Sequence, residues 1–319
     1  MNKIDVKYDK GILLIYKGKK IYFDLIGMPS NKPDIIIFSH LHSDHFNSKI
    51  INKLKGTLIV MSKTSKHILE KIYGINNPSI IGVEDLSEHE FIGLHFKFTP
   101  SGHCAGSIQT SISDDIDIIY TGDINIEPRL ILKPPPVLKS NILIIEATYG
   151  HPSYIFPSRT EIYRNILEEA KKKLEETGYL IIGGRTLGTS QELTALFSYS
   201  KIRRDIFVHK KIYVFNKIHE ENYEPLGFYT PLNKDISKNG IVIKPLNIVF
   251  KHTDLNRLIC TGWAVKWKNG YPLSSHSDFN HLIKYVNENG AEEIYAVYGF
   301  SKIFAKYLKR EYNIDAYYL

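Results

Sequence analysis

Short apolar segments alternate with polar turns along the first part of the chain, a pattern typical of β-strands joined by tight loops. Residues 3–8, 11–16 and 19–23 are predicted to form antiparallel strands. A strand is predicted over residues 34–38, where the run Ile-Ile-Ile-Phe indicates burial on both faces. Further strands are predicted over residues 57–61, 96–99, 108–111, 116–120 and 142–145, and helices over residues 48–54 and 65–73.

The pattern changes after residue 157. Ser158 and Glu161 have the spacing of a helix capping box, and apolar residues follow at helical spacing up to Gly178, where the helix is expected to end. A strand over residues 179–182, a glycine-rich turn and a helix near 190–197 continue in the rhythm of a βαβ unit. Strands over 258–260 and 291–297 are predicted on either side of a further helix, whose apolar face includes Phe279 and Val286. The sequence therefore predicts an α/β fold.

Composition excludes several classes of protein. The 319 residues are 43% hydrophobic, enough for a large core, so an intrinsically disordered chain is excluded. The net charge of +7 is compatible with a polyanionic partner, and it excludes a strongly acidic tail protein or a histone-like one. Two cysteines far apart indicate a reducing compartment rather than a disulfide framework. Without a signal sequence or an apolar run of membrane-spanning length, we expect a cytoplasmic protein with no membrane association.

A cluster of potential metal ligands follows the strand predicted over residues 34–38. It comprises His40, His42, Asp44 and His45. In an extended segment His40 and His42 point the same way, and a turn is expected to bring Asp44 and His45 to the same cavity. Imidazoles and a carboxylate suit zinc. The alternative, a run of solvated loop histidines, is disfavoured because four such residues rarely gather within six positions.

This H-x-H-x-D-H pattern resembles the metallo-β-lactamase superfamily. Two later segments match the same superfamily in order and context, Ser101-Gly102-His103 and Thr121-Gly122-Asp123. The resemblance implies that His40, His42 and His103 bind one zinc, that Asp44 and His45 bind a second, and that Asp123 bridges the two. Cys104 is interpreted as a small buried residue, because that superfamily places no ligand there.

Three further segments are similar to the β-CASP nucleases, a branch that includes RNase J, the pre-mRNA 3′-end endonuclease, Artemis-like DNA nucleases and bacterial ligase-associated DNA exonucleases. The segments are Ile144-Ile145-Glu146, the glycine-rich turn 183–192, and Ser274-Ser275-His276. The resemblance implies that Glu146 and His276 act together as a general acid, while Asp44 contributes to the catalytic centre. A carboxylate near His276 favours its protonated form. Residues expected to bind substrate phosphate are Arg185, Thr186, Thr189, Ser274 and Ser275.

The same resemblance implies the architecture. We expect a four-layer αββα metallo-β-lactamase sandwich formed by residues 1–155 and 256–319, with an α/β β-CASP lobe inserted over residues 156–255. The expected activity is zinc-dependent hydrolysis of phosphodiester bonds in single-stranded nucleic acid.

The chain departs from the family at Tyr298. RNA-cleaving relatives carry a second-zinc histidine in a strand-end H-G pair, whereas this chain has Tyr298-Gly299. A neutral phenol is a poor zinc ligand, so we expect one tight zinc site and a second, weaker one that manganese could also fill. Artemis-like DNA nucleases also lack this histidine, but they have Asp where this chain has Glu146. These markers conflict, and with the compact length they favour a DNA exonuclease slightly over an RNA-processing ribonuclease.

Two other functions would leave different marks in the sequence. A small-molecule thioester or lactone hydrolase would use a ligand histidine in the C-terminal half in place of Glu146 and His276, and His252 is a candidate. A non-catalytic nucleic-acid-binding scaffold would have lost metal ligands, which the intact cluster argues against.

Overall fold

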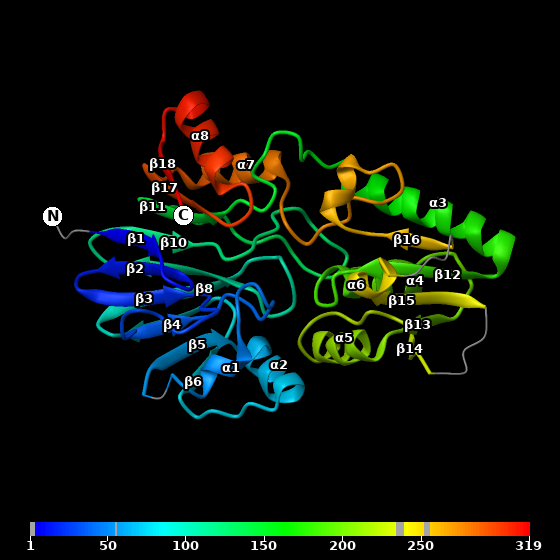
Figure 1. The fold of residues 1–319 in the computed structure, drawn as a ribbon, viewed down its shortest axis with the longest axis horizontal. Coiled ribbons are helices and arrows are strands. Elements are labelled where there is room, and N and C mark those ends of the chain that lie inside the picture. Colours follow the sequence, from blue (N-terminus) through cyan, green and yellow to red (C-terminus); the bar gives the residue numbers. More distant parts are fainter. Residues whose placement is uncertain (1–3, 55, 234–238, 252–255) are drawn as a thin grey trace. The chain divides into compact units, whose positions relative to one another are not determined.

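The computed structural model describes residues 4–54, 56–233, 239–251 and 256–319, and it is a mixed α/β fold (Figure 1). The chain forms two compact units. The first comprises residues 1–126, 134–152 and 279–319, and the second comprises residues 127–133 and 153–278. Among the described residues, no helix is both long and apolar enough to cross a lipid bilayer.

The first unit contains two sheets. The six-stranded sheet has its strands in chain order, antiparallel from β1 to β3 and parallel from β3 to β6. These strands are β1 (Asp5–Tyr8), β2 (Ile12–Tyr16), β3 (Lys19–Phe23), β4 (Ile35–Ile37), β5 (Leu58–Ser62) and β6 (Ile80–Val83). The helices α1 (Ser48–Ile51) and α2 (Lys63–Tyr73) accompany this sheet, and α2 lies against β5 and β6.

The second sheet of this unit has seven strands in the order β18-β17-β11-β10-β9-β8-β7. They are β7 (Ser87–Phe91), β8 (Leu94–Pro100), β9 (Ile108–Ser113), β10 (Asp117–Tyr120), β11 (Ile142–Glu146), β17 (Glu293–Val297) and β18 (Asp315–Tyr318). Figure 1 shows α7 (Phe279–Asn289) and α8 (Ser301–Tyr312) beside β17 and β18.

Strand β11 shows how one segment serves two cores. Ile142 and Ile144 belong to an apolar cluster that joins both sheets, whereas Leu143 and Ile145 belong to a cluster shared with α7 and α8. Neighbouring side chains of a strand point to opposite faces. A strand covered on both faces therefore needs a continuous apolar sequence, which explains Ile-Leu-Ile-Ile at residues 142–145.

The second unit is built on a five-stranded sheet in which each neighbouring pair is parallel, ordered β14-β13-β15-β12-β16. Its strands are β12 (Tyr179–Gly184), β13 (Ile206–Val208), β14 (Thr230–Pro231), β15 (Gly240–Pro245) and β16 (Arg257–Ile259). The helices are α3 (Arg159–Thr177), α4 (Thr189–Ser198), α5 (Lys210–Asn222), α6 (Leu246–Val249) and the 3₁₀ turn η1 (Gly262–Lys266). The core includes Ile162, Ile166, Ala170 and Leu174, one stripe of α3 at helical spacing.

Most predicted elements are confirmed, with shifted ends. Ser158 caps α3 as predicted, because Ser158 Oγ accepts a hydrogen bond from the Glu161 N–H, which is one of the two bonds of a capping box. The helix predicted from residue 65 begins at Lys63, because Ser62 caps it by accepting from the Ser65 N–H. The helix predicted over residues 48–54 ends at Ile51. Residue 3, the first of the predicted strand 3–8, lies outside the described residues.

The compact units differ from the predicted domain segments at both junctions. Residues 127–133 belong to the second unit, which extends to Asp278 instead of ending at residue 255. The reason for the later end is pairing, since Ile181 and Ile182 of β12 align in parallel with Arg257 and Leu258 of β16.

Candidate metal centre

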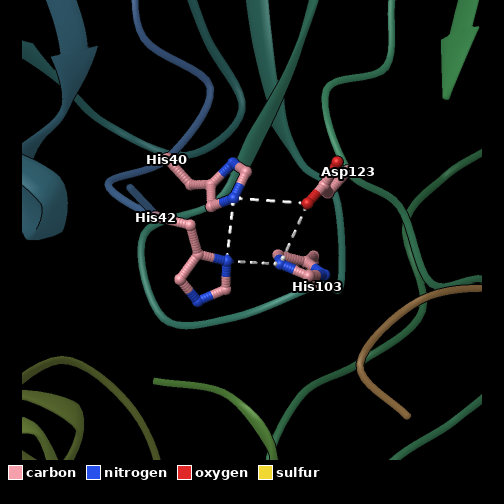
Figure 2. Close-up of side chains that lie close together, drawn as sticks. All are labelled: His40, His42, His103 and Asp123. Carbon is pink, nitrogen blue, oxygen red and sulfur yellow. Dashed lines mark hydrogen bonds and ion pairs between the residues drawn. The ribbon is translucent and has the colours of Figure 1, made fainter. Parts of the chain in front are cut away.

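Four buried side chains of the first unit converge on one point (Figure 2). His40 and His42 follow β4, His103 follows β8, and Asp123 follows β10. Their exposed fractions lie between 0% and 7%. His42 Nδ1 lies 3.0 Å from His40 Nε2 and 3.1 Å from His103 Nε2, and Asp123 Oδ2 lies 3.4 Å from both of those Nε2 atoms. All four ligand atoms lie within 4.8 Å of one another.

These separations fit a tetrahedral metal site. Donor atoms at about 2.0–2.1 Å from a four-coordinate zinc stand about 3.3 Å apart, close to the distances observed. Three imidazoles and a carboxylate are also a donor set that zinc accepts. Among the described residues, the buried donors His40, His42, His103 and Asp123 can therefore hold a metal ion.

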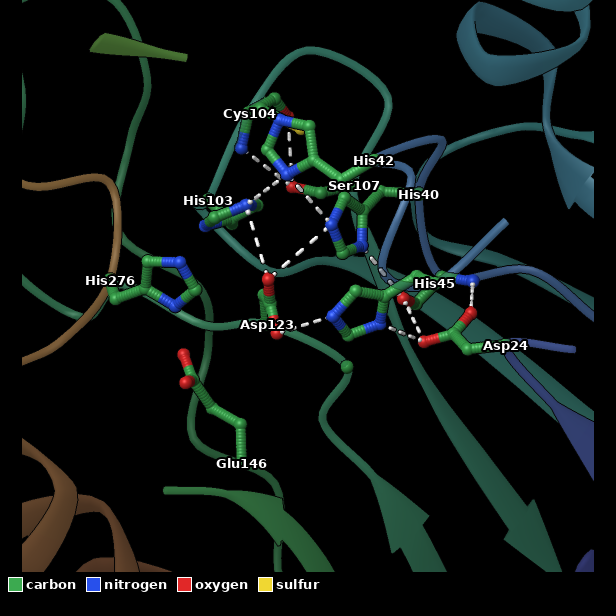
Figure 3. Close-up of polar contacts among 12 residues, drawn as sticks. Asp24, His40, His42, His45, His103, Cys104, Ser107, Asp123, Glu146 and His276 are labelled. Atoms are coloured by element: carbon green, nitrogen blue, oxygen red, sulfur yellow. Dashed lines mark hydrogen bonds and ion pairs between the residues drawn. The ribbon is translucent and has the colours of Figure 1, made fainter. Parts of the chain in front are cut away.

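Asp123 also faces a second histidine through its other oxygen. His45 Nε2 lies 3.1 Å from Asp123 Oδ1, whereas Oδ2 faces His40 and His103 (Figure 3). One carboxylate thus presents separate oxygens to two groups of imidazoles. This placement is the one expected of a bridging ligand.

The turn that carries Asp123 depends on Gly122. Gly122 has a φ of 54°, in the left-handed region that favours glycine. A Cβ atom added there would lie 2.5 Å from Ser39 Cβ. A side chain at position 122 would therefore push apart the loops that bring Asp123 to the histidines.

Asp24 is a member of the site that sequence reasoning missed. Its Oδ2 lies 2.8 Å from His45 Nδ1 and accepts hydrogen bonds from Ser39 Oγ and the Tyr120 hydroxyl, both at 2.6 Å. An imidazole whose Nδ1 donates to a carboxylate is held in one orientation, which here directs the Nε2 atom of His45 towards Asp123. The available signal was a carboxylate directly after the buried strand β3, whereas Asp123 was identified by the Thr-Gly-Asp turn that resembles the superfamily.

The surroundings of His45 and His40 shift the pKa values of the two imidazoles in opposite directions. Burial alone would lower the pKa of His45, but the carboxylates of Asp123 and Asp24 outweigh it and raise that pKa well above its usual value. The pKa of His40 is lowered, first by burial and then by the neighbouring His45. His40 is therefore favoured as a neutral imidazole, the form that binds metal.

Tyr298 contacts this network through its ring and its hydroxyl. The Tyr298 ring lies 4.6 Å from the His45 ring, and its hydroxyl lies 3.0 Å from that of Tyr120. Burial, followed by the charge of Asp24, raises the pKa of Tyr298 well above its usual value, so the phenol stays neutral. Its backbone φ is 62°, an uncommon conformation for a non-glycine residue.

The side chain of Asp44 is exposed. Among the described residues, two groups of side chains that include His40 could hold a metal ion, and Asp44 belongs to neither group. The N–H groups of His45 and Phe46 both donate to the His42 carbonyl, at 3.0 and 2.9 Å. This tight turn buries His45 and Phe46, but it does not bury Asp44. Cys104 is buried, as the sequence predicted.

Glu146 lies at the end of β11 and is fully buried. Its carboxylate accepts hydrogen bonds from two backbone amides, Ile124 N–H at 2.9 Å and Thr148 N–H at 3.1 Å. These contacts fix its position in the first unit. His276 belongs to the second unit, so a pairing of the two side chains stays a prediction.

The remaining predicted residues lie in two loops of the second unit. Ser274, Ser275 and His276 are buried in the loop after η1, where the His276 N–H donates to Ser274 Oγ at 3.0 Å. Arg185 and Thr186 are partly exposed in the glycine-rich turn, whereas Thr189, the first residue of α4, is buried. Their binding of substrate phosphate stays a prediction.

Comparison with known proteins gives several relatives. No model of a known protein family matches the chain. The chain is 23% identical to a probable DNA ligase of Opitutus terrae over 98% of this chain and 31% of that protein. It is 24% identical to an RNase J-like protein of Methanocaldococcus jannaschii over 90% of this chain and 86% of that protein. It is 26% identical to cleavage and polyadenylation specificity factor subunit 3 of Dictyostelium discoideum over 63% of this chain and 32% of that protein.

The chain thus spans about a third of the length of two of these relatives and most of the third. A crystal structure of an Enterococcus faecalis protein of unknown function shares the fold, with a TM-score of 0.66, 11% identity and coverage of 99% of this chain and 97% of that one. The sequence relatives confirm the predicted resemblance to the β-CASP nucleases of the metallo-β-lactamase superfamily.

Proposed function

We propose that the protein is a metal-dependent nuclease that hydrolyses phosphodiester bonds in single-stranded nucleic acid. The observation that carries the proposal is the convergence of four buried donor atoms from His40, His42, His103 and Asp123 at tetrahedral separations. The relatives named above support a nucleic-acid hydrolase. We assign the first unit as a metallo-β-lactamase αββα sandwich and the second as its inserted β-CASP lobe.

The proposed ions are zinc, with one tight site at His40, His42, His103 and Asp123. His45 and Asp123 contribute to a second, weaker site, with Asp44 as the third ligand that the resemblance implies. When bound, zinc supplies a Lewis acid that activates water and offsets the negative charge that develops on phosphate. The tight site fits zinc because its donors are those that zinc prefers.

The residues of the chain have separate roles in the proposed reaction. Asp24 fixes the ring orientation of His45 through Nδ1. His276 is assigned by resemblance as the general acid that protonates the leaving oxygen, and Glu146 as the carboxylate that favours its protonated form. Arg185, Thr186, Thr189, Ser274 and Ser275 are assigned to binding the substrate phosphates.

The substrate is proposed to be DNA, with RNA as the second candidate. Two observations support DNA: Tyr298 replaces the second-zinc histidine of RNA-cleaving relatives, and the chain matches a probable DNA ligase over 98% of this chain. The RNase J-like protein, which this chain matches over 86% of that protein's length, favours RNA. The weaker alternative, a small-molecule hydrolase using His252, concerns a residue outside the described part of the chain.

End-labelled single-stranded DNA and RNA of one sequence, incubated with protein and zinc or manganese, test the proposal. We expect a ladder or a mononucleotide product that grows with time and is absent for His42→Ala. A generic thioester serves as the competing substrate. Rapid thioester cleavage with both oligonucleotides intact would contradict the proposal.

A further inference from the structure

Both tryptophans of the chain lie on one exposed segment of the second unit. Trp263 is 39% exposed and Trp267 is 41% exposed, although large aromatic side chains are usually well buried. They lie at the start of η1 and directly after its end. Each has an aromatic neighbour, since Tyr154 lies 5.3 Å from Trp263 and Phe250 lies 5.9 Å from Trp267.

The segment is held in a defined shape at its base. Cys260 and Tyr271 form a bridge, in which the Thr261 N–H donates to the Tyr271 carbonyl at 3.0 Å. Gly270 allows the chain to pass close to Ala264 and Trp267 on its way back to Tyr271. A Cβ atom at position 270 would lie 2.8 Å from Ala264 Cβ and 3.3 Å from a ring carbon of Trp267. The tryptophans are therefore displayed on a closed loop rather than on a loose end.

The charged lysine and arginine side chains of this segment are not balanced by carboxylates. From residue 256 to residue 277 the chain has three lysine or arginine residues, Arg257, Lys266 and Lys268, and no acidic residue. Lys266 and Lys268 are both exposed, and Lys266 Nζ lies 4.2 Å above the Tyr154 ring. Cations interleaved with aromatic rings suit a ligand that offers both negative charge and flat apolar faces.

We propose that an exposed patch of the second unit, here called the aromatic–basic surface, binds the bases and phosphates of single-stranded nucleic acid. It consists of Phe250, Trp263, Lys266, Trp267 and Lys268. Tyr154, which is 7% exposed, packs against Trp263 and Lys266 and supports this surface. The proposal rests on the proposed nuclease function and names the part of the second unit that selects the strand. Exposed indole faces stack on unpaired bases, and the lysines neutralise phosphate. A duplex keeps its base faces stacked inside, so this surface favours single strands.

Intrinsic fluorescence tests the proposal directly, because both tryptophans of the chain belong to this surface. The zinc-loaded protein is mixed with a single-stranded oligonucleotide in a stopped-flow instrument, and emission is recorded before cleavage products accumulate. We expect saturable quenching by the single strand and much weaker quenching by the duplex of the same sequence.

Variants are compared by the anisotropy of a labelled oligonucleotide. The double variant Trp263→Ala/Trp267→Ala is expected to bind the oligonucleotide about a hundredfold more weakly, because each lost stacking contact costs about tenfold in affinity. The same double change to Phe should restore most of the affinity, which separates stacking from misfolding. The matched control is Phe228→Ala, since Phe228 is 91% exposed elsewhere in the same unit.

The outcomes separate this inference from the proposed function. Wild-type affinity in the double alanine variant, with cleavage intact, overturns the aromatic–basic surface and leaves the nuclease assignment standing. Quenching as strong with duplex as with single strand also overturns it. Saturable quenching without any cleavage by the wild-type protein supports the surface and contradicts the nuclease assignment.

Discussion

His42 and Asp123 contribute ligand atoms to the centre of the candidate site, so their removal is the most direct test of the site. We expect His42→Ala and Asp123→Ala each to lose bound metal and to lower cleavage by orders of magnitude, because the proposed nucleophile depends on the metal. Metal content by mass spectrometry and cleavage of labelled oligonucleotide are the measurements. His95→Ala is the matched control, since the His95 side chain is 48% exposed on β8. Cleavage at the wild-type rate by either ligand variant would refute the assignment.

Tyr298 leads to a second prediction about metal stoichiometry. Its neutral phenol is a weak zinc ligand, so purified protein should hold about one tight metal per chain. Tyr298→His should tighten the second site, and histidine tolerates the left-handed backbone found there better than most residues. Zinc titration of chelated protein is the measurement. Two equally tight sites in the wild type, unchanged in the variant, would show that Tyr298 only packs against His45 and Tyr120.

The candidate ligands His40 and His42 could be predicted from sequence because neighbouring histidines carry a strong spacing signal, whereas His103 and Asp123 were predicted from the resemblance to a superfamily. His40 and His42 share one face of an extended segment after a buried strand, and the structure places them together. Asp24 could not be singled out, because one carboxylate after a strand is common in sequences. Its importance arises from contacts with Tyr120 and His45, which only the folded sheets bring near.

Helix α4 has a fully buried carboxylate that holds segments of the second unit together. Glu192 Oε2 accepts from Arg129 Nη2 and Oε1 accepts from Arg159 Nη1, both at 2.6 Å. Arg159 Nη2 also donates to the Ser274 carbonyl at 2.8 Å. Burial alone would raise the pKa of Glu192, but the guanidinium groups of Arg129 and Arg159 hold it below its usual value.

Glu192→Gln should therefore destabilise the second unit strongly. The change leaves two buried guanidinium groups without their shared carboxylate, a loss of about 3–5 kcal/mol in the free energy of unfolding. Urea unfolding followed by tryptophan fluorescence is suitable, because both tryptophans lie in this unit. Glu175→Gln, on an exposed position of α3, is the control. Equal stability of the two variants would show that the network contributes little.

Helix α5 has a buried histidine that should make stability depend on pH. Neither ring nitrogen of His219 has a hydrogen-bond partner among the described residues. Burial, and then the charge of Arg129, lowers the pKa of His219 to about 4. The unfolded chain, with a pKa of about 6.5, binds a proton that the folded chain excludes. Stability from His219 is therefore complete above about pH 6.5 and is lost as the pH falls towards 4.

Between pH 7.5 and pH 5 this loss should reach about 2 kcal/mol, at 1.36 kcal/mol per unit below about pH 6.5. His219→Leu should remove that part of the pH dependence. The measurement is the free energy of unfolding of both proteins at the two pH values. Parallel losses in wild type and variant would assign the titration to other groups.

The positions of strands and helices were easier to predict than the pairing of the strands. The order of β12 and α4 could be predicted from the sequence, because an apolar strand followed by a glycine-rich turn and a helix is typical of a βαβ unit. The strand over residues 258–260 was also predicted, but its partner was not, and it pairs with β12 of the second unit. Local periodicity specifies a strand, whereas pairing depends on the packing of distant segments.

The charge of the whole molecule leads to the last prediction. A net charge of +7 is small for 319 residues, so strong binding of a polyanion requires local clusters of cations. Each phosphate neutralised on a single strand adds about 0.7 to the slope of log affinity against log salt. If four phosphates are neutralised, a fourfold rise in salt should weaken binding about fiftyfold.

A neutral substrate releases no counterions and should show almost no slope under the same conditions. Binding of a labelled single strand is therefore measured at several salt concentrations, with cleavage of a neutral thioester followed in parallel. A steep slope for the oligonucleotide, reduced in Lys266→Ala by about 0.7, would connect the charge of the molecule to its proposed substrate. A flat slope would instead favour a small-molecule hydrolase, because a phosphodiester strand cannot be held by charge without releasing ions.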